Sequence, residues 1–393
     1  MKLKRILNVI LACTIIFAIA LPAGASAANP IKLYIDGVLK TPTVDPIVEG
    51  GATFVPVRFV TENLGADVSW DSAKRQATVK SAAANIVFTI GSKSYTVNGV
   101  SKTLTAAPIL FTSGSTSYTM VPIRAIAEGM GADVNYDSKT YAAYVNYFST
   151  MTGTLKITGS TTLQPIAQAA ADKLNTLNSK KISISVAGGG SGTGINDCIA
   201  GTNNLGMSSR ELTADEASKI NDFDVARDGI AVIVHPSNKV TNLTKQQAAD
   251  IFLGKIKNWN EVGGDSAPIL VYTRETGSGT RATLEEMLLS KESVVSIATP
   301  FTSSTLIKQA VAREKNSIGF DSIGFVDRTV KAVSLNGTAP TAASVKSGNY
   351  IMGRDLYIVC KGRPTGNAAK FIDYLRTEDC QKNIVVKEGY IER

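Results

Sequence analysis

The sequence has few of the residues that enzymes commonly use for acid–base or metal chemistry. It contains one histidine, His235, and four cysteines among 393 residues, with no C-x-x-C pair. It has no G-x-S-x-G, Walker A or complete G-x-G-x-x-G motif, and no His and Asp cluster with the spacing of a metal site. These absences argue against a hydrolase or a metalloenzyme. We predict that the protein is not an enzyme and has no metal and no cofactor.

The cysteines do not suggest a disulfide framework. Cys13 lies near the N-terminus, which leaves Cys198, Cys360 and Cys380 in the rest of the chain. Because three cysteines cannot pair fully, we expect them to be buried as small apolar residues. The sequence does not decide whether Cys360 and Cys380 form a disulfide.

The N-terminus has the pattern of a secretory signal peptide, residues 1–27. Lys2, Lys4 and Arg5 precede an apolar run, Ile6–Leu21, and Ala25-Ser26-Ala27 is an A-x-A cleavage site. The apolar run falls short of the roughly 20 residues that span a bilayer. We therefore predict cleavage near Ala27 and a secreted, extracellular protein, held at the cell surface or the cell wall.

The mature chain is mildly basic. Removal of the leader would lower the formal net charge from +8 to +5. This charge suits an anionic ligand or an anionic wall polymer. No lysine or arginine run of the kind found in nucleic-acid binders occurs, so we expect no nucleic-acid partner.

A repeat dominates the first part of the mature chain. Residues 54–71 read FVPVRFVTENLGADVSWD, and residues 120–137 read MVPIRAIAEGMGADVNYD. The two copies match at one fixed offset, which indicates a duplicated supersecondary unit. Each copy predicts an extended V-P segment, a short amphipathic helix, a glycine that ends the helix, and a strand entered by G-A-D-V.

This repeat resembles the copper amine oxidase N-terminal-like domain, also called the stalk domain. The resemblance implies a small duplicated α+β domain over residues 28–148, with a spacer or wall-interaction role. The segment contains no His and no Cys, so nothing in it would ligate copper. Arg58 and Arg124 are expected to brace the repeat through Glu62 and Glu128, although binding of a polyanion is an alternative.

After residue 148 the sequence pattern changes to short apolar strands that alternate with helices. This alternation predicts an α/β fold with parallel sheets. The segment 149–393 contains about 240 residues, and this length favours two lobes over one. We expect the repeat module to fold separately, so that a chain beginning near Met151 folds by itself. The expected strands are 155–158, 181–186, 229–235 and 269–273, and the expected helices are 163–178, 195–200, 245–253 and 281–289.

Three glycine- and hydroxyl-rich turns lie between these strands and helices. They are Gly159-Ser160-Thr161-Thr162, the run Gly188–Gly194 with Ser191 at its centre, and Gly277-Ser278-Gly279-Thr280, which Arg274 precedes. Free backbone N–H groups and the helix dipole make such turns anion sites, and hydroxyls and an arginine add donors. One such turn is ordinary helix capping. Three in one α/β module predict an oxyanion site between the lobes.

Several longer stretches resemble the phosphate-binding proteins of high-affinity phosphate ABC transporters, a branch of the periplasmic-binding-protein superfamily. They are ITGSTTLQPI, GGGSGTGI, LGMSSREL, ARDGIAVIVHPSN, LTKQQAADIFLGKIKNWNEVGG, RETGSGTR and FIDYLRTEDCQKNIVVKEGYI. The resemblance implies a two-lobed type II periplasmic-binding-protein fold. It also implies a monomer that captures inorganic phosphate outside the membrane and delivers it to the permease subunits of the transporter.

The resemblance carries over to individual residues, with one departure. The phosphate-binding positions it implies are Ser160, Thr161, Thr162, Ser191, Arg274, Ser278, Gly279 and Thr280. In the family an aspartate follows the small residue of the G-x-S-D stretch and accepts the proton of hydrogen phosphate. Here Ser209 stands there, followed by Arg210. We expect Ser209 and Arg210 to join the site and Asp228 to accept the proton.

Other functions stay open on the sequence alone. The same site would serve a sensor that presents bound phosphate to a membrane receptor. A surface or wall-interaction protein would rely on the repeat module, through a cell-wall polymer. An aspartate at this position would disfavour fully ionised sulfate, which has no proton to donate to the carboxylate. Because Ser209 stands there instead, another tetrahedral oxyanion stays open as the ligand.

Overall fold

The computed structural model describes residues 30–393, so the predicted leader, residues 1–27, lies outside the described residues. Within 30–393, no helix combines the length and the apolar character needed to cross a membrane. Cys198, Cys360 and Cys380 are all buried and unpaired, as expected, so Cys360 and Cys380 form no bridge.

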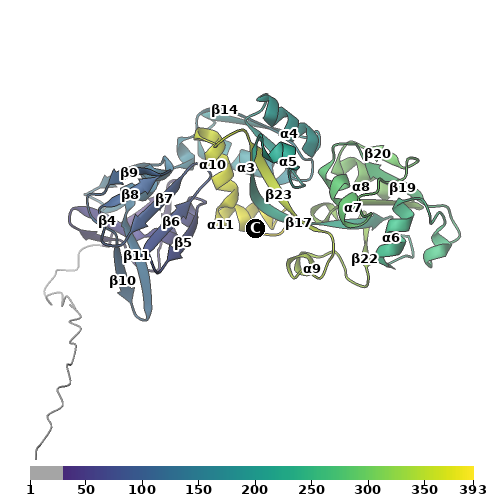
Figure 1. The fold of residues 1–393 in the computed structure, drawn as a ribbon, viewed down its shortest axis with the longest axis horizontal. Helices are drawn as coiled ribbons and strands as arrows, with labels where there is room; N and C mark the ends of the chain where they lie inside the picture. Colours follow the sequence, from purple (N-terminus) through teal and green to yellow (C-terminus); the bar gives the residue numbers. More distant parts are fainter. Residues whose placement is uncertain (1–29) are drawn as a thin grey trace, which may run out of the picture. The chain divides into compact units, whose positions relative to one another are not determined.

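The repeat module consists of small sheets and two short helices (Figure 1). Its sheets have the strand orders β12-β13-β1-β2, β10-β11-β4-β3 and β5-β6-β7-β8-β9. The strands are β1 (Lys32–Ile35), β2 (Val38–Lys40), β3 (Ile47–Glu49), β4 (Ala52–Pro56), β5 (Asp67–Asp71), β6 (Gln76–Lys80), β7 (Asn85–Thr89), β8 (Ser94–Val97), β9 (Val100–Thr103), β10 (Ile109–Ser113), β11 (Thr116–Pro122), β12 (Asp133–Asp137) and β13 (Ala142–Asn146). The helices are α1 (Val57–Asn63) and α2 (Ile123–Met130), followed by η1 (Phe148–Thr150).

The two sequence repeats have equivalent structures. In each copy a strand ends at a V-P pair, a helix follows directly, and a G-A-D-V segment leads into the next strand. Gly131 ends α2 at φ 85°, a backbone conformation that glycine adopts without strain. β4 and β11 pair antiparallel with Val55 opposite Val121, so the copies are related by a local twofold axis through this pair. The predicted duplicated α+β unit is therefore present.

The second module has a ten-stranded mixed sheet. Eight strands have the order β15-β14-β16-β23-β17-β21-β19-β20, and the other two branch from it, with β22 paired to β17 and β18 paired to β22. Its strands are β14 (Gly153–Gly159), β15 (Ile182–Ala187), β16 (Leu205–Ser208), β17 (Asn221–Val234), β18 (Asn242–Leu243), β19 (Leu270–Arg274), β20 (Thr299–Phe301), β21 (Ser317–Ser322), β22 (Lys331–Leu335) and β23 (Gly353–Cys360). Its helices are α3 (Gln164–Leu177), α4 (Ser191–Ala200), α5 (Ala214–Ala217), α6 (Lys245–Phe252), η2 (Trp259–Val262), α7 (Gly279–Met287), α8 (Ser304–Arg313), η3 (Ile323–Phe325), α9 (Ala342–Lys346), α10 (Gly366–Arg376), α11 (Glu378–Cys380) and η4 (Gln381–Val385).

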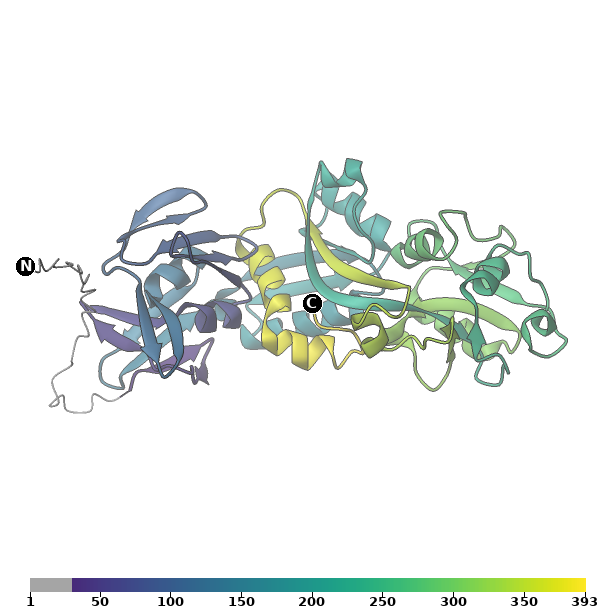
Figure 2. The same ribbon diagram turned by 60° about the horizontal axis from the view of Figure 1, so that its bottom comes forward.

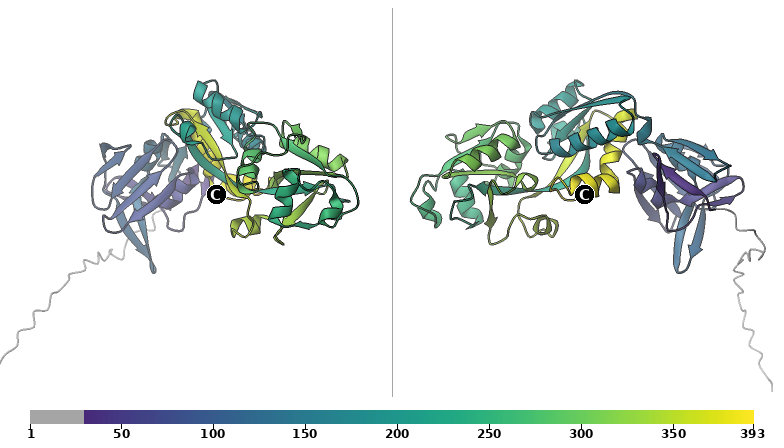
Figure 3. Two further views of the ribbon diagram at one scale, coloured as in Figure 1. Left: turned by 45° about the vertical axis from the view of Figure 1, so that its right-hand side comes forward. Right: turned by 180° about the vertical axis from the view of Figure 1, so that it is seen from behind.

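The module has the two predicted lobes, each with its own apolar core. β14 pairs in parallel with β15 and β16 in the first lobe, and β19 pairs in parallel with β20 and β21 in the second. β17 pairs with β23 along residues 221–229 and with β21 along residues 230–234, so it passes from one lobe into the other. Figures 2 and 3 show β17 (teal) and β23 (yellow) side by side from several directions.

The repeat module and the first lobe share one continuous apolar core. Asp373 of α10 is fully buried where they meet, and its two carboxylate oxygens accept hydrogen bonds from the Ala82 backbone N–H (2.7 Å) and the Tyr147 hydroxyl (2.7 Å). A Cβ on Gly65 would lie 1.8 Å from the Asp373 carbonyl oxygen, so the contact requires glycine. These contacts argue against the expectation that the second module folds by itself, because separation would expose this shared core.

Asp373 should make stability depend on pH. Burial raises the pKa of its carboxyl to about 7, although the Ala82 N–H and the Tyr147 hydroxyl oppose the rise. Because the unfolded carboxyl ionises near pH 4, the folded state should lose stability as the pH rises from about 4 to about 7, by roughly 1.4 kcal/mol per pKa unit. Asp373→Asn should abolish that loss. Urea unfolding across this range measures it, with exposed Asp172→Asn as the control. Equal pH dependence in Asp373→Asn and the wild type would contradict the assignment.

Candidate functional site

The three predicted turns meet where the two lobes face each other. The first lobe contributes the turn between β14 and α3, the first residue of α4, and the residue after β16. The second lobe contributes the end of β19 and the start of α7. The residues so placed are all buried: Ser160, Thr161, Thr162, Ser191, Ser209, Arg274, Ser278, Gly279 and Thr280. We call this set the hydroxyl cluster.

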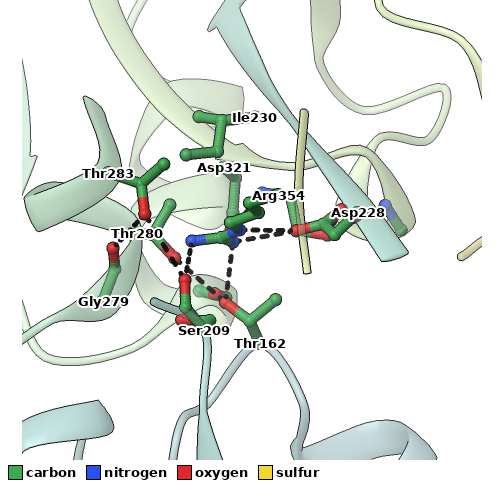
Figure 4. Close-up of polar contacts among 12 residues, drawn as sticks. Thr162, Ser209, Asp228, Ile230, Gly279, Thr280, Thr283, Asp321 and Arg354 are labelled. Carbon is green, nitrogen blue, oxygen red and sulfur yellow. Dashed lines mark hydrogen bonds and ion pairs between the residues drawn. The ribbon is translucent and has the colours of Figure 1, made fainter. Parts of the chain in front are cut away.

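Direct contacts join the two sides of the hydroxyl cluster. The Thr162 and Thr280 hydroxyl oxygens, one from each lobe, are 3.0 Å apart. Within the first lobe, the Ser191 and Ser209 hydroxyl oxygens are 3.2 Å apart. The Ser209 N–H also donates to the Ser191 hydroxyl at 3.0 Å. Thr283 of α7 donates to the Ser209 carbonyl at 3.4 Å, so α7 of the second lobe contacts the first lobe directly (Figure 4).

Backbone conformation brings these groups close together. Gly190 precedes α4 at φ 86°, and α4 begins at Ser191 rather than near Ile195 as the sequence suggested. Ser191 is therefore at the positive end of the helix dipole. A Cβ on Gly279 would lie 2.4 Å from the Ser191 hydroxyl oxygen and 2.6 Å from that of Ser209. The α7 N-terminus can therefore approach the hydroxyls of the first lobe only because this residue is glycine.

Arg274 is fully buried and connects both lobes. Its Nη2 donates to the Thr161 hydroxyl at 3.1 Å, and its Nη1 donates to the Ser304 hydroxyl at 3.2 Å. Nε and Nη2 also bond the Glu275 carboxylate, at 3.0 and 2.9 Å. This pair with Glu275 is largely buried, because the Arg274 side chain is only 1% exposed.

A second buried arginine lies beside the cluster, on β23. Arg354 donates from Nε and Nη2 to one oxygen of Asp228, at 3.1 and 2.8 Å, and from Nη1 to the Ser209 carbonyl at 3.0 Å. Its Nη2 also reaches the Thr162 hydroxyl at 3.5 Å. The other Asp228 oxygen accepts from the Ser322 hydroxyl at 2.7 Å. Both Asp228 oxygens are therefore used in positioning other groups.

Asp321 is the buried acid whose acceptor capacity is least used. One of its oxygens accepts the Ser322 backbone N–H at 2.8 Å, while the buried Oδ2 has no hydrogen-bond partner among the described residues. Burial raises the pKa of this carboxyl to about 6, against the opposing effects of Ser304, the Ser322 N–H and the charge of Arg274. The negative charge of Asp228 adds to this rise in the pKa of Asp321.

Arg210 does not join the hydroxyl cluster. Its guanidinium forms two 2.8 Å bonds with the Glu216 carboxylate and another with the Glu211 carbonyl. The hydrogen bonds from the Arg210 guanidinium lower the pKa of the Glu216 carboxyl to about 2. The structure therefore separates Arg210 from Ser209, its neighbour in the predicted site.

Sequence reasoning missed Arg354, Asp321, Ser304 and Thr283. Arg354 lies near the start of an apolar strand and outside every glycine-rich turn, so only its isolation in the GRDLYIVC segment could have singled it out. Ser304 begins α8 after an ordinary serine N-cap, Ser303. Arg354 and Asp321 are brought to this region by the pairing of β17 with β23 and β21, which local sequence does not reveal.

Comparisons with known proteins agree with this geometry. Residues 148–379 match the family described as PBP superfamily domain, and residues 34–146 match the copper amine oxidase N-terminal domain. The phosphate-binding protein PstS of Bacillus subtilis is 37% identical over 243 residues, which cover 61% of this chain and 80% of that protein. PstS of Pseudomonas aeruginosa is 30% identical over 273 residues, covering 62% and 84%.

Two solved structures are also similar. One is a putative phosphate ABC transporter substrate-binding protein with bound phosphate from Clostridium perfringens, with 36% identity and a TM-score of 0.59. The other is an ABC-type phosphate transport receptor from Vibrio cholerae, with 34% identity and a TM-score of 0.52. Each match covers 61% of this chain and 100% of the other. The chain therefore belongs to the PBP superfamily and, within it, to the family of phosphate-binding proteins named PstS.

Proposed function

We propose that the protein captures inorganic phosphate outside the membrane and passes it to the permease subunits of a phosphate ABC transporter, without catalysing a reaction. The observation that carries this proposal is the hydroxyl cluster, in which buried hydroxyls and a helix N-terminus from each lobe converge beside Arg274 and Arg354. The similarity to the C. perfringens substrate-binding protein, which has bound phosphate, and to the V. cholerae phosphate transport receptor supports the same ligand class.

The chemistry of the cluster suits a tetrahedral oxyanion. Serine and threonine hydroxyls can each donate one hydrogen bond and reorient to fit the ligand, while backbone N–H groups at α4 and α7 add fixed donors. Each buried arginine already has a carboxylate partner, Glu275 or Asp228. Neutral donors would therefore supply much of the ligand's coordination, and the arginines would supply directional, charge-assisted bonds.

A titration tests the proposal directly. The mature protein should bind one phosphate per chain with micromolar or tighter affinity, which corresponds to about −8 kcal/mol or better. Isothermal titration with phosphate, sulfate and molybdate measures this. Saturation by sulfate at concentrations where phosphate gives no signal would overturn the assignment.

Arg274→Ala should weaken phosphate binding by well over tenfold. The change removes a buried cation that connects Thr161, Ser304 and the bound anion, a loss of roughly 2 to 5 kcal/mol for a desolvated charge pair. Arg274→Lys should recover only part of the affinity, because an ammonium cannot reproduce the planar guanidinium.

The matched control for Arg274 is Arg313→Ala, which changes an exposed arginine at the end of α8 in the same lobe. Titration of phosphate into all three variants, after thermal melts confirm that each is folded, gives the comparison. An affinity for Arg274→Ala equal to that of Arg313→Ala would remove Arg274 from the site.

We further propose that Asp321, rather than Asp228, accepts the proton of hydrogen phosphate. Asp228 already accepts bonds from Arg354 and Ser322, whereas the Asp321 Oδ2 has no partner among the described residues. Asp321 also lies close to Ser304, which Arg274 contacts. Asp228 then acts as the residue that positions Arg354.

Asp321→Asn should lower the preference for phosphate over sulfate by roughly tenfold or more, since an amide presents a donor as well as an acceptor to the ligand. Asp228→Asn should instead weaken both anions, because it releases Arg354. Exposed Asp265→Asn in the same lobe is the control. Competition titrations with the two anions measure the ratio. A changed ratio in Asp228→Asn with an unchanged ratio in Asp321→Asn would reverse the two roles.

A further inference from the structure

The two repeats form two equivalent pockets on the surface of the repeat module, with volumes of about 460 and 350 Å³. The same repeat positions line both pockets. In the first copy they are Pro56, Arg58, Val68, Trp70 and Ala77, and in the second they are Pro122, Arg124, Val134, Tyr136 and Ala143. We call these the Trp70 pocket and the Tyr136 pocket.

The local twofold axis between β4 and β11 explains why the pockets come as a pair. Each pocket takes its helix start and two strands from its own repeat. The Trp70 pocket is completed by residues 116–119 of β11, and the Tyr136 pocket by residues 52–53 of β4. The shared strand pair therefore contributes one wall to each pocket.

Each pocket presents an aromatic ring to solvent. Trp70 is 42% exposed and Tyr136 is 43% exposed, although both lie in strands where packing against a neighbour would be the usual way to bury a large ring. An exposed ring in a walled pocket supplies a flat apolar face with a polar edge. Such a face suits the C–H surface of a sugar ring, which is apolar while its hydroxyls remain polar.

The charged residues of the pockets favour a neutral, hydroxyl-rich ligand over a polyanion. Arg58 pairs with Glu62 at 3.1 Å and Arg124 with Glu128 at 3.5 Å, as the sequence suggested. All four side chains are at least half exposed, so these pairs add little stability. Because each guanidinium already has a counter-charge, it offers directional donors to hydroxyls without adding an unbalanced positive charge to the pocket.

We propose that the Trp70 and Tyr136 pockets form a paired site for a polysaccharide chain. Two equivalent pockets that share a strand pair fit a ligand that repeats its own units, because engagement of the second pocket becomes intramolecular once the first is filled. Such a site would hold the phosphate-binding lobes beside a surface glycan. It uses none of the residues of the hydroxyl cluster.

Sedimentation of the mature protein with insoluble peptidoglycan, stripped of its anionic polymers, tests this proposal. Trp70→Ala and Tyr136→Ala should each weaken binding about tenfold, and the double variant should fall to the background level. Tyr141→Ala is the matched control, since this tyrosine is 43% exposed in the same module but lies outside both pockets. The double variant Arg58→Gln, Arg124→Gln, which keeps both rings, should also weaken binding about tenfold.

Thermal melts and phosphate titrations on the same variants should match the wild type, which separates the glycan site from the phosphate site. The proposal is overturned if the wild type does not sediment with the stripped glycan. It is also overturned if the Trp70→Ala, Tyr136→Ala variant binds like Tyr141→Ala. Binding only to unstripped walls would overturn it as well, and would assign the pockets to an anionic polymer.

Discussion

Asp228 and Arg354 face each other across β17 and β23, the paired strands at the junction of the lobes. Both side chains are almost fully buried, so the pair is stable only if its remaining donors and acceptors are satisfied. Ser322 of the second lobe and Ser209 and Thr162 of the first lobe provide those partners. One buried ion pair thus fixes the relative position of groups from both lobes, and the hydroxyl cluster is built around it.

Close packing at Gly279 and a second buried arginine complete the hydroxyl cluster. Hydroxyls at the N-termini of α4 and α7 lie close together because Gly279 leaves no side chain between them. Arg274 adds a second cation, held by two hydrogen bonds to the Glu275 carboxylate and directed at Thr161 and Ser304. Neutral donors and two oriented cations then lie together in one buried place.

The repeat module packs directly against the first lobe. Its core continues into the first lobe, and within residues 30–393 the Asp373 carboxylate accepts its hydrogen bonds from two groups of the repeat module, the Ala82 N–H and the Tyr147 hydroxyl. At the far C-terminus, Arg393 bonds both Asp67 of the repeat module and Asp224 of β17. These contacts tie the orientation of the module to the lobe that carries half of the hydroxyl cluster, so that its exposed pockets are presented from a fixed base.

The sequence alone determined the features that depend on local chemistry. The repeat, its glycine-ended helices, the alternation of strands and helices, and the three anion-type turns are all encoded within short stretches, where backbone propensity and capping act. Tertiary structure decided what those stretches could not. It brought Arg354 and Ser304 into contact with the hydroxyl cluster, tied Arg210 to Glu216, used Asp228 to hold an arginine, and joined the repeat module to the first lobe. Each of these outcomes depends on contacts between residues far apart in the chain, and such contacts are set by strand pairing and burial rather than by neighbouring residues.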